Sequence, residues 1–384
     1  MSLATLIEEQ RLIICVGSGG VGKTTTAAAL GLAAAKKGRR VLVLTIDPAR
    51  RLANSLGLSQ FGNEETRIQL SSDIEGELWA MMLDTRSTFD ALINRVSPDD
   101  DTRERILNNR VYRHVSDSFG GSQEYMATEQ LYEVVVSGRY DLVVLDTPPV
   151  KNALDFLESP GRLVQFLDKR ILSWFLAPYE EKRVVGRLFR GTSAMVFKLL
   201  GYIFGREFLD ELAEFLFIFR DLYDGFRERH EAVISLFSTP GTTFTVVCAP
   251  NEPSVAVARY FLAELSQRDM PCSGVLMNQM HPTLGHDIQP DDVLGDLAEK
   301  LGSDLSAHTA TQLMARLGAN HRRLIGLSRA EQALAGSLGS LLGHAQRMWQ
   351  VPRLEGEVHD IDALGRVFDH VREVNEFPSH STTE

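Results

Sequence analysis

The chain has 384 residues, 44% of them hydrophobic and 24% charged, which is typical of an ordinary folded protein of one or two domains. Its formal net charge of −11 would repel a phosphate backbone, so we expect no nucleic-acid partner. The three cysteines lie far apart in the chain, which argues against a disulfide scaffold and against a cysteine pair that binds a metal.

No export or membrane signal is visible in the sequence. Glu8, Glu9 and Arg11 interrupt the apolar residues at the start of the chain. No uninterrupted apolar run reaches the roughly 18 residues of a membrane-spanning helix. We therefore expect a cytoplasmic protein that is not integral to a membrane.

The first 150 residues alternate between strand and helix patterns. The alanine-rich stretch 23–37 predicts a helix that ends at Gly38. Alternation of this kind predicts an α/β fold, with a mostly parallel sheet and helices on both of its faces. Short apolar runs predict strands buried on both faces at 11–16, 41–46, 78–83 and 140–145.

The pattern becomes helical between residues 151 and 239. Residues 1–150 and 240–375 are therefore predicted to form one α/β domain, and 151–239 an inserted helical subdomain that offers a client or partner surface. The apolar residues that recur there at helical spacing include Phe208, Leu209, Leu212, Phe215, Leu216 and Phe219.

The strand and helix alternation then resumes. Residues 281–317 are polar and are predicted to be irregular, and 376–384 to be a disordered tail. The remaining predicted elements are strands at 243–248, 274–277 and 349–354 and helices at 254–268 and 360–374.

A phosphate-binding loop lies between the first predicted strand and the first long helix. Residues 17–24 fit the GxxxxGK[ST] pattern without a mismatch, which predicts a P-loop NTPase. Lys23 is expected to pair with the β- and γ-phosphates of ATP and the Thr24 hydroxyl to bind Mg²⁺. The predicted nucleotide-binding residues of the loop are Gly19, Gly20, Val21, Gly22, Lys23, Thr24 and Thr25.

Two aspartates follow predicted strands. Because ligands bind beyond the carboxyl ends of parallel strands, Asp47 and Asp146 are expected to face the phosphates. Asp146 is a predicted Mg²⁺ ligand, held directly or through water. Asp47 is predicted, with Lys23, to be catalytic and to orient the water that attacks the γ-phosphate.

These motifs together resemble the ArsA family, whose ATPases drive arsenite pumps or deliver tail-anchored membrane proteins. The resemblance rests on the loop, on Asp47-Pro48-Ala49, on Asp146-Thr-Pro-Pro149 and on Asn278-Gln279. It implies a dimer that closes around nucleotide, with Asn278 bonded to adenine. It also implies that the region around Pro352 covers the base.

Three departures from the family pattern are visible. Ser18 stands where the family usually has a second lysine that reaches the partner's nucleotide. Arg50 and Arg51 follow the first switch, where the targeting enzymes have His-Asn, and they could supply the missing cation. The cysteine pair that holds zinc in eukaryotic members is absent, so zinc is not predicted.

The resemblance also suggests an apolar client groove, with Phe197, Leu200 and Phe204 among its candidate lining residues. Packing of the same side chains in a core is the competing interpretation. Three functions therefore stay open: an ATPase that drives a homodimer or heterodimer around a client, a weakly active nucleotide-binding subunit of a heterodimer, and a small-molecule kinase.

Overall fold

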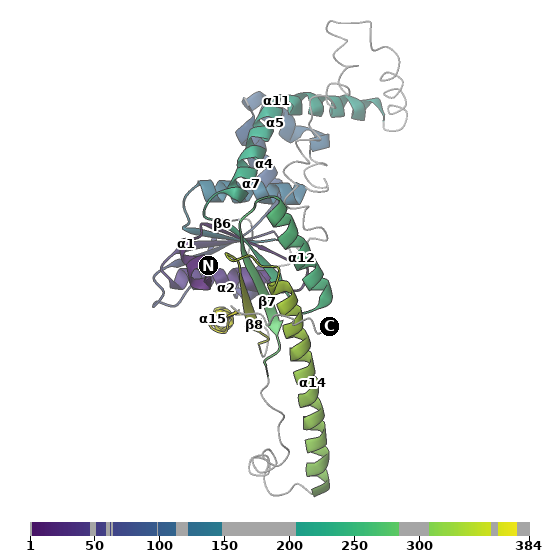
Figure 1. Cartoon of the computed structure of the whole chain (residues 1–384). Helices are drawn as coiled ribbons and strands as arrows, with labels where there is room; N and C mark the ends of the chain where they lie inside the picture. The colour runs from purple at the N-terminus through teal and green to yellow at the C-terminus, as the bar shows by residue number, and fades with distance from the viewer. Residues whose placement is uncertain are drawn as a thin grey trace.

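The computed structural model describes residues 2–46, 51–58, 62, 64–97, 99–112, 122–147, 205–283, 307–354 and 360–374. Within these ranges the chain forms a twisted nine-stranded sheet with helices on both faces (Figure 1). The strands are β1 (Leu12–Val16), β2 (Arg40–Thr45), β3 (Thr66–Arg67), β4 (Glu77–Met82), β5 (Leu142–Asp146), β6 (Thr242–Cys248), β7 (Cys272–Met280), β8 (Arg347–Pro352) and β9 (Arg372–Val374).

The strand order is β3-β4-β2-β5-β1-β6-β7-β8-β9. The seven inner strands pair in parallel, and only β3 and β9 at the two edges of this described sheet run antiparallel to their neighbours. The predicted mostly parallel α/β fold is thereby confirmed. β1 lies between β5 and β6. Strands β2 to β5 lie on one side of β1 and strands β6 to β9 on the other, so the carboxyl end of β1 is a switch point of the sheet, where ligands bind.

The helices divide between the two faces of the sheet. One core packs under α4 (Thr85–Val96), α7 (Ser122–Val136), α11 (Arg206–Ser238) and α12 (Glu252–Gln267). The other packs under α1 (Leu3–Glu9), α2 (Lys23–Lys36), α3 (Arg51–Ser55) and α15 (Ile361–Asp369). The C-terminal end of α14 (Ala307–Gly339) joins the first core through Ala335 and Leu338. The inner strands read as continuous apolar runs because both of their faces are buried.

Three sequence predictions differ from the structure. Helix α14 (Ala307–Gly339) begins inside the segment predicted to be irregular, so that prediction is wrong from residue 307 onward. The last helix ends at Asp369 instead of continuing to 374, and 372–374 form β9, which adds to the edge at β8. Helix α5 (Asp100–Asn108) and strand β3 were not predicted. The predicted tail 376–384 lies outside the described residues.

A partly buried ion cluster around the buried Glu129 fixes α11 to the helices beside it. Arg229 of α11 donates to both Glu129 and Glu133 of α7, and its guanidinium lies 4.7 Å from the Tyr132 ring centroid. Arg95 of α4 pairs with Glu133 at 2.8 Å. Burial raises the pKa of Glu129, and the arginines oppose that shift. Truncating one member would leave a buried charge without its partners, which is costly.

The apolar side chains of α11 are buried only in part. Leu209, Phe215 and Leu216 are buried, and the last two belong to the core under α4, α7, α11 and α12, whereas Phe208 is 42% exposed. Phe197, Leu200 and Phe204 lie outside the described residues, as does the side chain of Phe219. None of the described helices is long and apolar enough to cross a membrane.

Close backbone contact between β7 and β8 generates a stability prediction. Gly274 has φ +139°, and a Cβ atom there would lie 1.8 Å from the carbonyl oxygen of Arg347 on β8. We expect Gly274→Ala to lower the free energy of unfolding by about 2 kcal/mol or more, measured by urea denaturation. The matched control is Gly326→Ala in helix α14, where a Cβ meets no atom within 4 Å. The control should be neutral or stabilising by about 1 kcal/mol, and equal losses in both variants would contradict the contact argument.

Candidate functional site

The loop after β1 forms a cradle for phosphate oxygens at the switch point of the sheet. Gly22 has φ +89°, and a Cβ atom there would lie 2.2 Å from the amide nitrogen of Asn278, so only glycine fits. Helix α2 begins at Lys23, which directs its first N–H groups and its positive dipole end into the cradle.

Lys23 is held at the mouth of this loop. Its Nζ donates to the carbonyl oxygens of Gly17 at 3.1 Å and Ser18 at 2.9 Å. The side chain is only 6% exposed. A buried ammonium exchanges carbonyl partners for phosphate oxygens at little cost, because the desolvation of the charge is already complete.

The carboxylate of Asp146 lies next to the loop. Its Oδ2 accepts hydrogen bonds from Thr24 Oγ1 at 2.7 Å and from Thr45 Oγ1 at 2.9 Å. The residue is fully buried at the end of β5. Thr24 and Asp146 therefore offer a hydroxyl and a carboxylate oxygen side by side, and these hard oxygen donors are what Mg²⁺ takes in nucleotide sites. The residues present fit a magnesium ion.

A cavity of about 210 Å³ opens in front of the loop. It brings together residues from three segments that are far apart in the sequence. Its lining residues are Gly20, Gly22, Lys23, Thr24, Thr25, Arg51, Ser55 and Thr147.

Two of these lining residues come from the start and end of α3. Arg51 was considered from the sequence as a source of positive charge, and Ser55 was missed because nothing in its local sequence marks it. Thr147, from the predicted second switch, donates its hydroxyl to the carbonyl of Cys15 at 2.7 Å. Thr45 was also missed. Its place at the end of a parallel strand is a signal for a site residue, because ligands bind beyond the carboxyl ends of such strands.

The side of the loop where adenine is expected is formed by β7 and β8. Asn278 Nδ2 donates to the carbonyl of Val21 at 2.9 Å, and Gln279 Nε2 lies 3.5 Å from the carbonyl of Gly20. Pro352 pairs with Met280 across β8 and β7, so the structure brings Pro352 and Asn278 to the same corner. Asp47 lies outside the described residues, but Thr45, two positions earlier, is in register with Asp146.

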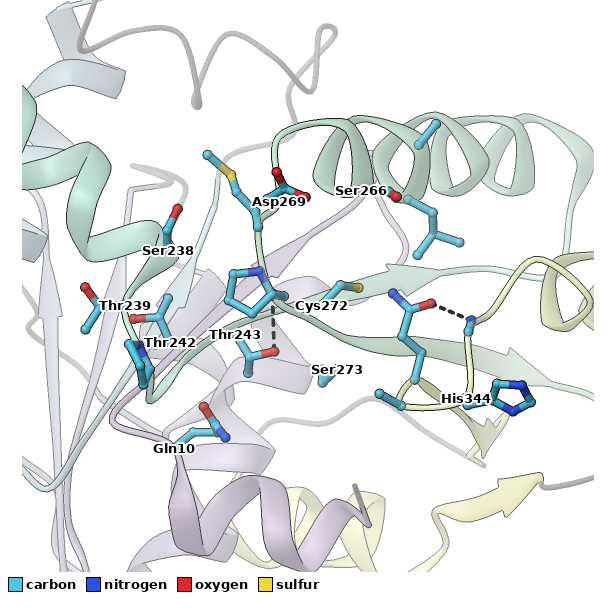
Figure 2. Close-up of a pocket in the computed structure, with 18 of the residues that line it drawn as sticks. Gln10, Ser238, Thr239, Thr242, Thr243, Ser266, Asp269, Cys272, Ser273 and His344 are labelled. Carbon is cyan, nitrogen blue, oxygen red and sulfur yellow. Dashed lines mark hydrogen bonds between the residues drawn. The ribbon is translucent and has the colours of Figure 1, made fainter.

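A second, more voluminous hollow lies elsewhere on the described part of the chain. It measures about 1000 Å³ at the amino-terminal edge of β6 and β7, where Figure 2 shows Thr242, Thr243 and Cys272 with Asp269, which follows α12. The phosphate loop lies at the opposite edge. Because ligands of parallel sheets bind at the carboxyl edge, the smaller cavity is the candidate nucleotide site despite its size.

The sheet, the loop and the two oxygen donors define the class of P-loop NTPases. Within that class, residues 10–290 match the family described as Anion-transporting ATPase. The chain belongs to this family, which confirms the resemblance to ArsA-type ATPases, and it is accordingly an ATP-binding enzyme of the ATPase class.

Similarity to individual proteins extends along the chain. It is 24% identical over 388 residues to the "ATPase ASNA1 homolog" of Plasmodium berghei (strain Anka), covering 99% of this chain and 92% of that protein. It is 27% identical over 286 residues to "ATPase get3" of Aspergillus terreus, covering 73% and 76%. It is 29% identical over 170 residues to "ATPase GET3" of Malassezia globosa, covering 44% and 48%.

The thiols are poorly suited to bind a metal or metalloid. Burial raises the pKa of all three: that of Cys15 lies far above its usual range, that of Cys248 rises to about 12 and that of Cys272 to about 11. In the described part of the chain, no three His, Cys, Asp or Glu side chains converge on one point. A cysteine-based arsenite site therefore has no support among these residues.

These pKa shifts predict slow thiol chemistry. Because the thiolate is the reacting form, the native chain at pH 8 should react with iodoacetamide much more slowly than the urea-unfolded chain. Cys272, the partly exposed thiol, should react faster as the pH rises toward 11, since its pKa is raised and the thiolate appears only there. Mass spectrometry of the labelled peptides checks this, and rapid labelling of Cys15 in the native chain at pH 8 would contradict it.

Proposed function

We propose that this chain hydrolyses ATP in a magnesium-dependent reaction at the loop 17–25. The observation that carries the proposal is the Thr24 hydroxyl bonded to the buried Asp146 carboxylate, 2.7 Å apart beside the phosphate cradle. When bound there, Mg²⁺ would neutralise charge on the phosphates and orient them. The hydroxyl and the carboxylate would hold the ion, and the dry position of Asp146 strengthens that electrostatic contact.

The other site residues are proposed to act on the phosphates and the base. Lys23 would transfer its hydrogen bonds from the two loop carbonyls to the β- and γ-phosphates, where it offsets the negative charge that moves to the leaving group. Asp47 would orient the attacking water. Asn278 and Pro352 would hold adenine, because they share the corner beside Val21.

We also propose that hydrolysis opens and closes a cytoplasmic dimer around an apolar client, such as a segment of a membrane protein. The helical part assigned to 151–239 would carry the client surface, and 1–150 with 240–375 would form the ATPase domain. Two observations support this arrangement: Phe208 of α11 is exposed, and the Arg229 cluster ties α11 to α7, which leads directly into β5 and Asp146. This connection from α11 through α7 to Asp146 would relay the nucleotide state.

The first test is hydrolysis by the purified chain. Lys23→Ala should lower the turnover number by about 100-fold or more, because the lost ammonium faces the transferring phosphoryl group. Phosphate release with Mg²⁺ and with EDTA measures this, and binding of a fluorescent ATP analogue separates loss of binding from loss of chemistry. Unchanged turnover in the Lys23→Ala variant would refute the assignment of the site.

We further propose that Arg51 supplies the positive charge that the family's second lysine provides. Ser18, at that lysine's position, carries no charge, and its hydroxyl donates to Ser254 Oγ at 3.1 Å. Arg51 instead lines the phosphate cavity from the first turn of α3. A guanidinium suits this role because it offers several N–H donors in one plane.

Removal of that charge gives a prediction for catalysis. Arg51→Ala should lower the turnover number by about 100- to 1,000-fold while ATP affinity changes less, because the cation acts mainly on the transition state. Arg51→Lys keeps the charge and should retain more of the rate. Steady-state kinetics on both variants checks this. Equal turnover in Arg51→Ala and the unmodified chain would remove Arg51 from the mechanism.

A second function stays open because of Ser18. The chain would then bind ATP mainly to hold a heterodimer in which a lysine-bearing relative supplies the cation. Under this alternative, Ser18→Lys should raise the turnover of the chain assayed alone, and a related ATPase should purify with the unmodified chain. The partner subunit is not needed if the unmodified chain alone hydrolyses ATP, if Lys23→Ala abolishes this hydrolysis, and if Ser18→Lys does not raise its rate.

A further inference from the structure

Strand β7 is irregular where it carries the residue proposed to bind adenine. Met277 pairs with Gln350 of β8, and Met280 pairs two positions further along β8, so three steps on β7 match two steps on β8. Gln279, inside this interval, has φ +63°, a left-handed conformation that is uncommon for a residue with a side chain. The interval is therefore a β-bulge, a feature that redirects side chains and occurs often beside active sites.

The bulge directs Asn278 toward the phosphate loop. Its Nδ2 donates to the carbonyl of Val21 at 2.9 Å, and the same nitrogen lies where a Cβ atom of residue 22 would be. With Nδ2 bonded to the loop, the side-chain oxygen of Asn278 can accept from the 6-amino group of adenine. Guanine has a carbonyl oxygen at that position, so two acceptors would face each other. The direction of this one amide therefore bears on the choice of base.

Helix α14 holds the chain directly after the bulge. Oε2 of Glu331 accepts from the backbone N–H of His281 at 2.8 Å, and Oε1 lies 2.7 Å from Nδ1 of the same histidine. Glu331 is only 4% exposed. A buried carboxylate that bonds a backbone group and a side chain at once fixes their positions closely. Figure 1 shows α14 beside β7 and β8 at this end.

The next residue of the helix holds the chain on the other side of the bulge. Gln332 and Gln350 exchange two hydrogen bonds between their side-chain amides, at 3.2 Å and 3.1 Å. Gln350 is the β8 partner of Met277, which directly precedes Asn278. Two consecutive residues of α14 thus bond to the two ends of the bulge. Left-handed backbone of this kind persists where the surrounding contacts determine it from several sides.

We propose that Glu331 and Gln332 are positioning residues, which hold the bulge in β7 and thereby aim Asn278 at the base. The inference rests on the proposed function, in which Asn278 bonds to adenine. Neither residue is among those that line the phosphate cavity. Loss of either side chain should therefore weaken the choice between adenine and guanine more than it slows hydrolysis at saturating ATP.

The affinities of the full chain for ATP and for GTP test the proposal. Competition of each nucleotide against a fluorescent ATP analogue gives the ratio of the two affinities. The preference for ATP should fall about tenfold in Glu331→Ala and several-fold in Gln332→Ala, because a misdirected amide loses about one hydrogen bond to the base. Turnover at saturating ATP should change by less than about threefold, since the contacts with the phosphates are kept.

Ser337→Ala is the matched control. Ser337 lies on the same helix and accepts from Arg259 at 2.9 Å, a bond that leads to α12 and not to β7 or β8. Its loss should leave the preference for ATP unchanged. Glu331→Gln keeps the size of the side chain and one acceptor oxygen, so it should lose less of the preference than Glu331→Ala. Circular dichroism shows whether each variant is folded. If Glu331→Ala does not fold, Glu331→Gln and Gln332→Ala decide by the same ratio.

Asn278→Ala separates failure of this inference from failure of the proposed function. If Asn278→Ala lowers the preference for ATP but the Glu331 and Gln332 variants do not, the positioning role is refuted and the adenine assignment stands. Equal weakening of ATP and GTP in those variants, or an equal change in Ser337→Ala, also refutes the role. If Asn278→Ala leaves the preference unchanged, the adenine assignment is wrong and the positioning role fails with it.

Discussion

The buried carboxylate of Asp146 is the point on which the site depends. It lies at the end of β5, fully covered, and accepts from Thr24 on the phosphate loop and from Thr45 on β2. A charge in this position needs polar partners, so the ends of β1, β2 and β5 must stay in their parallel register. The register thus keeps the loop, the two threonines and the start of the second switch within one small cavity.

The parallel sheet holds the residues around Asp146 in place, and two long helices, α11 and α14, extend away from the sheet (Figure 1). α11 rises from β6 and is fixed to α7 by the Arg229 cluster, and α14 is fixed to β7 by Glu331 and His281. Both attachments lie close in the chain to nucleotide-site residues, Asp146 after α7 and Asn278 before His281. Both long helices are therefore attached to segments of the chain that also carry residues of the nucleotide site.

Much of the fold could be predicted from sequence because its strands are buried on both faces. Such strands read as unbroken apolar runs, and β1, β2, β4, β5 and β6 all occur within a residue or two of the predicted positions. The first turns of α14 were not predicted, because they follow a polar stretch with prolines and glycines that gives no helical start signal before Ala307. Strand β9 was predicted to be the end of the last helix, because its three residues are too few to show the alternating pattern of a strand. Pairing with β8 stabilises these residues as a strand.

The class of the protein and the chemistry of the phosphate loop follow from the amino-acid sequence alone. The spacing of the glycines with Lys23 and Thr24 indicates a phosphate-binding loop, and the backbone of this one short segment forms the cradle. The distant residues that meet at the loop are set by the three-dimensional fold. They include Arg51 and Ser55 of α3, Thr45, and Asn278 against Val21. These contacts depend on the order and register of strands, which arise from long-range pairing that no local stretch of sequence encodes.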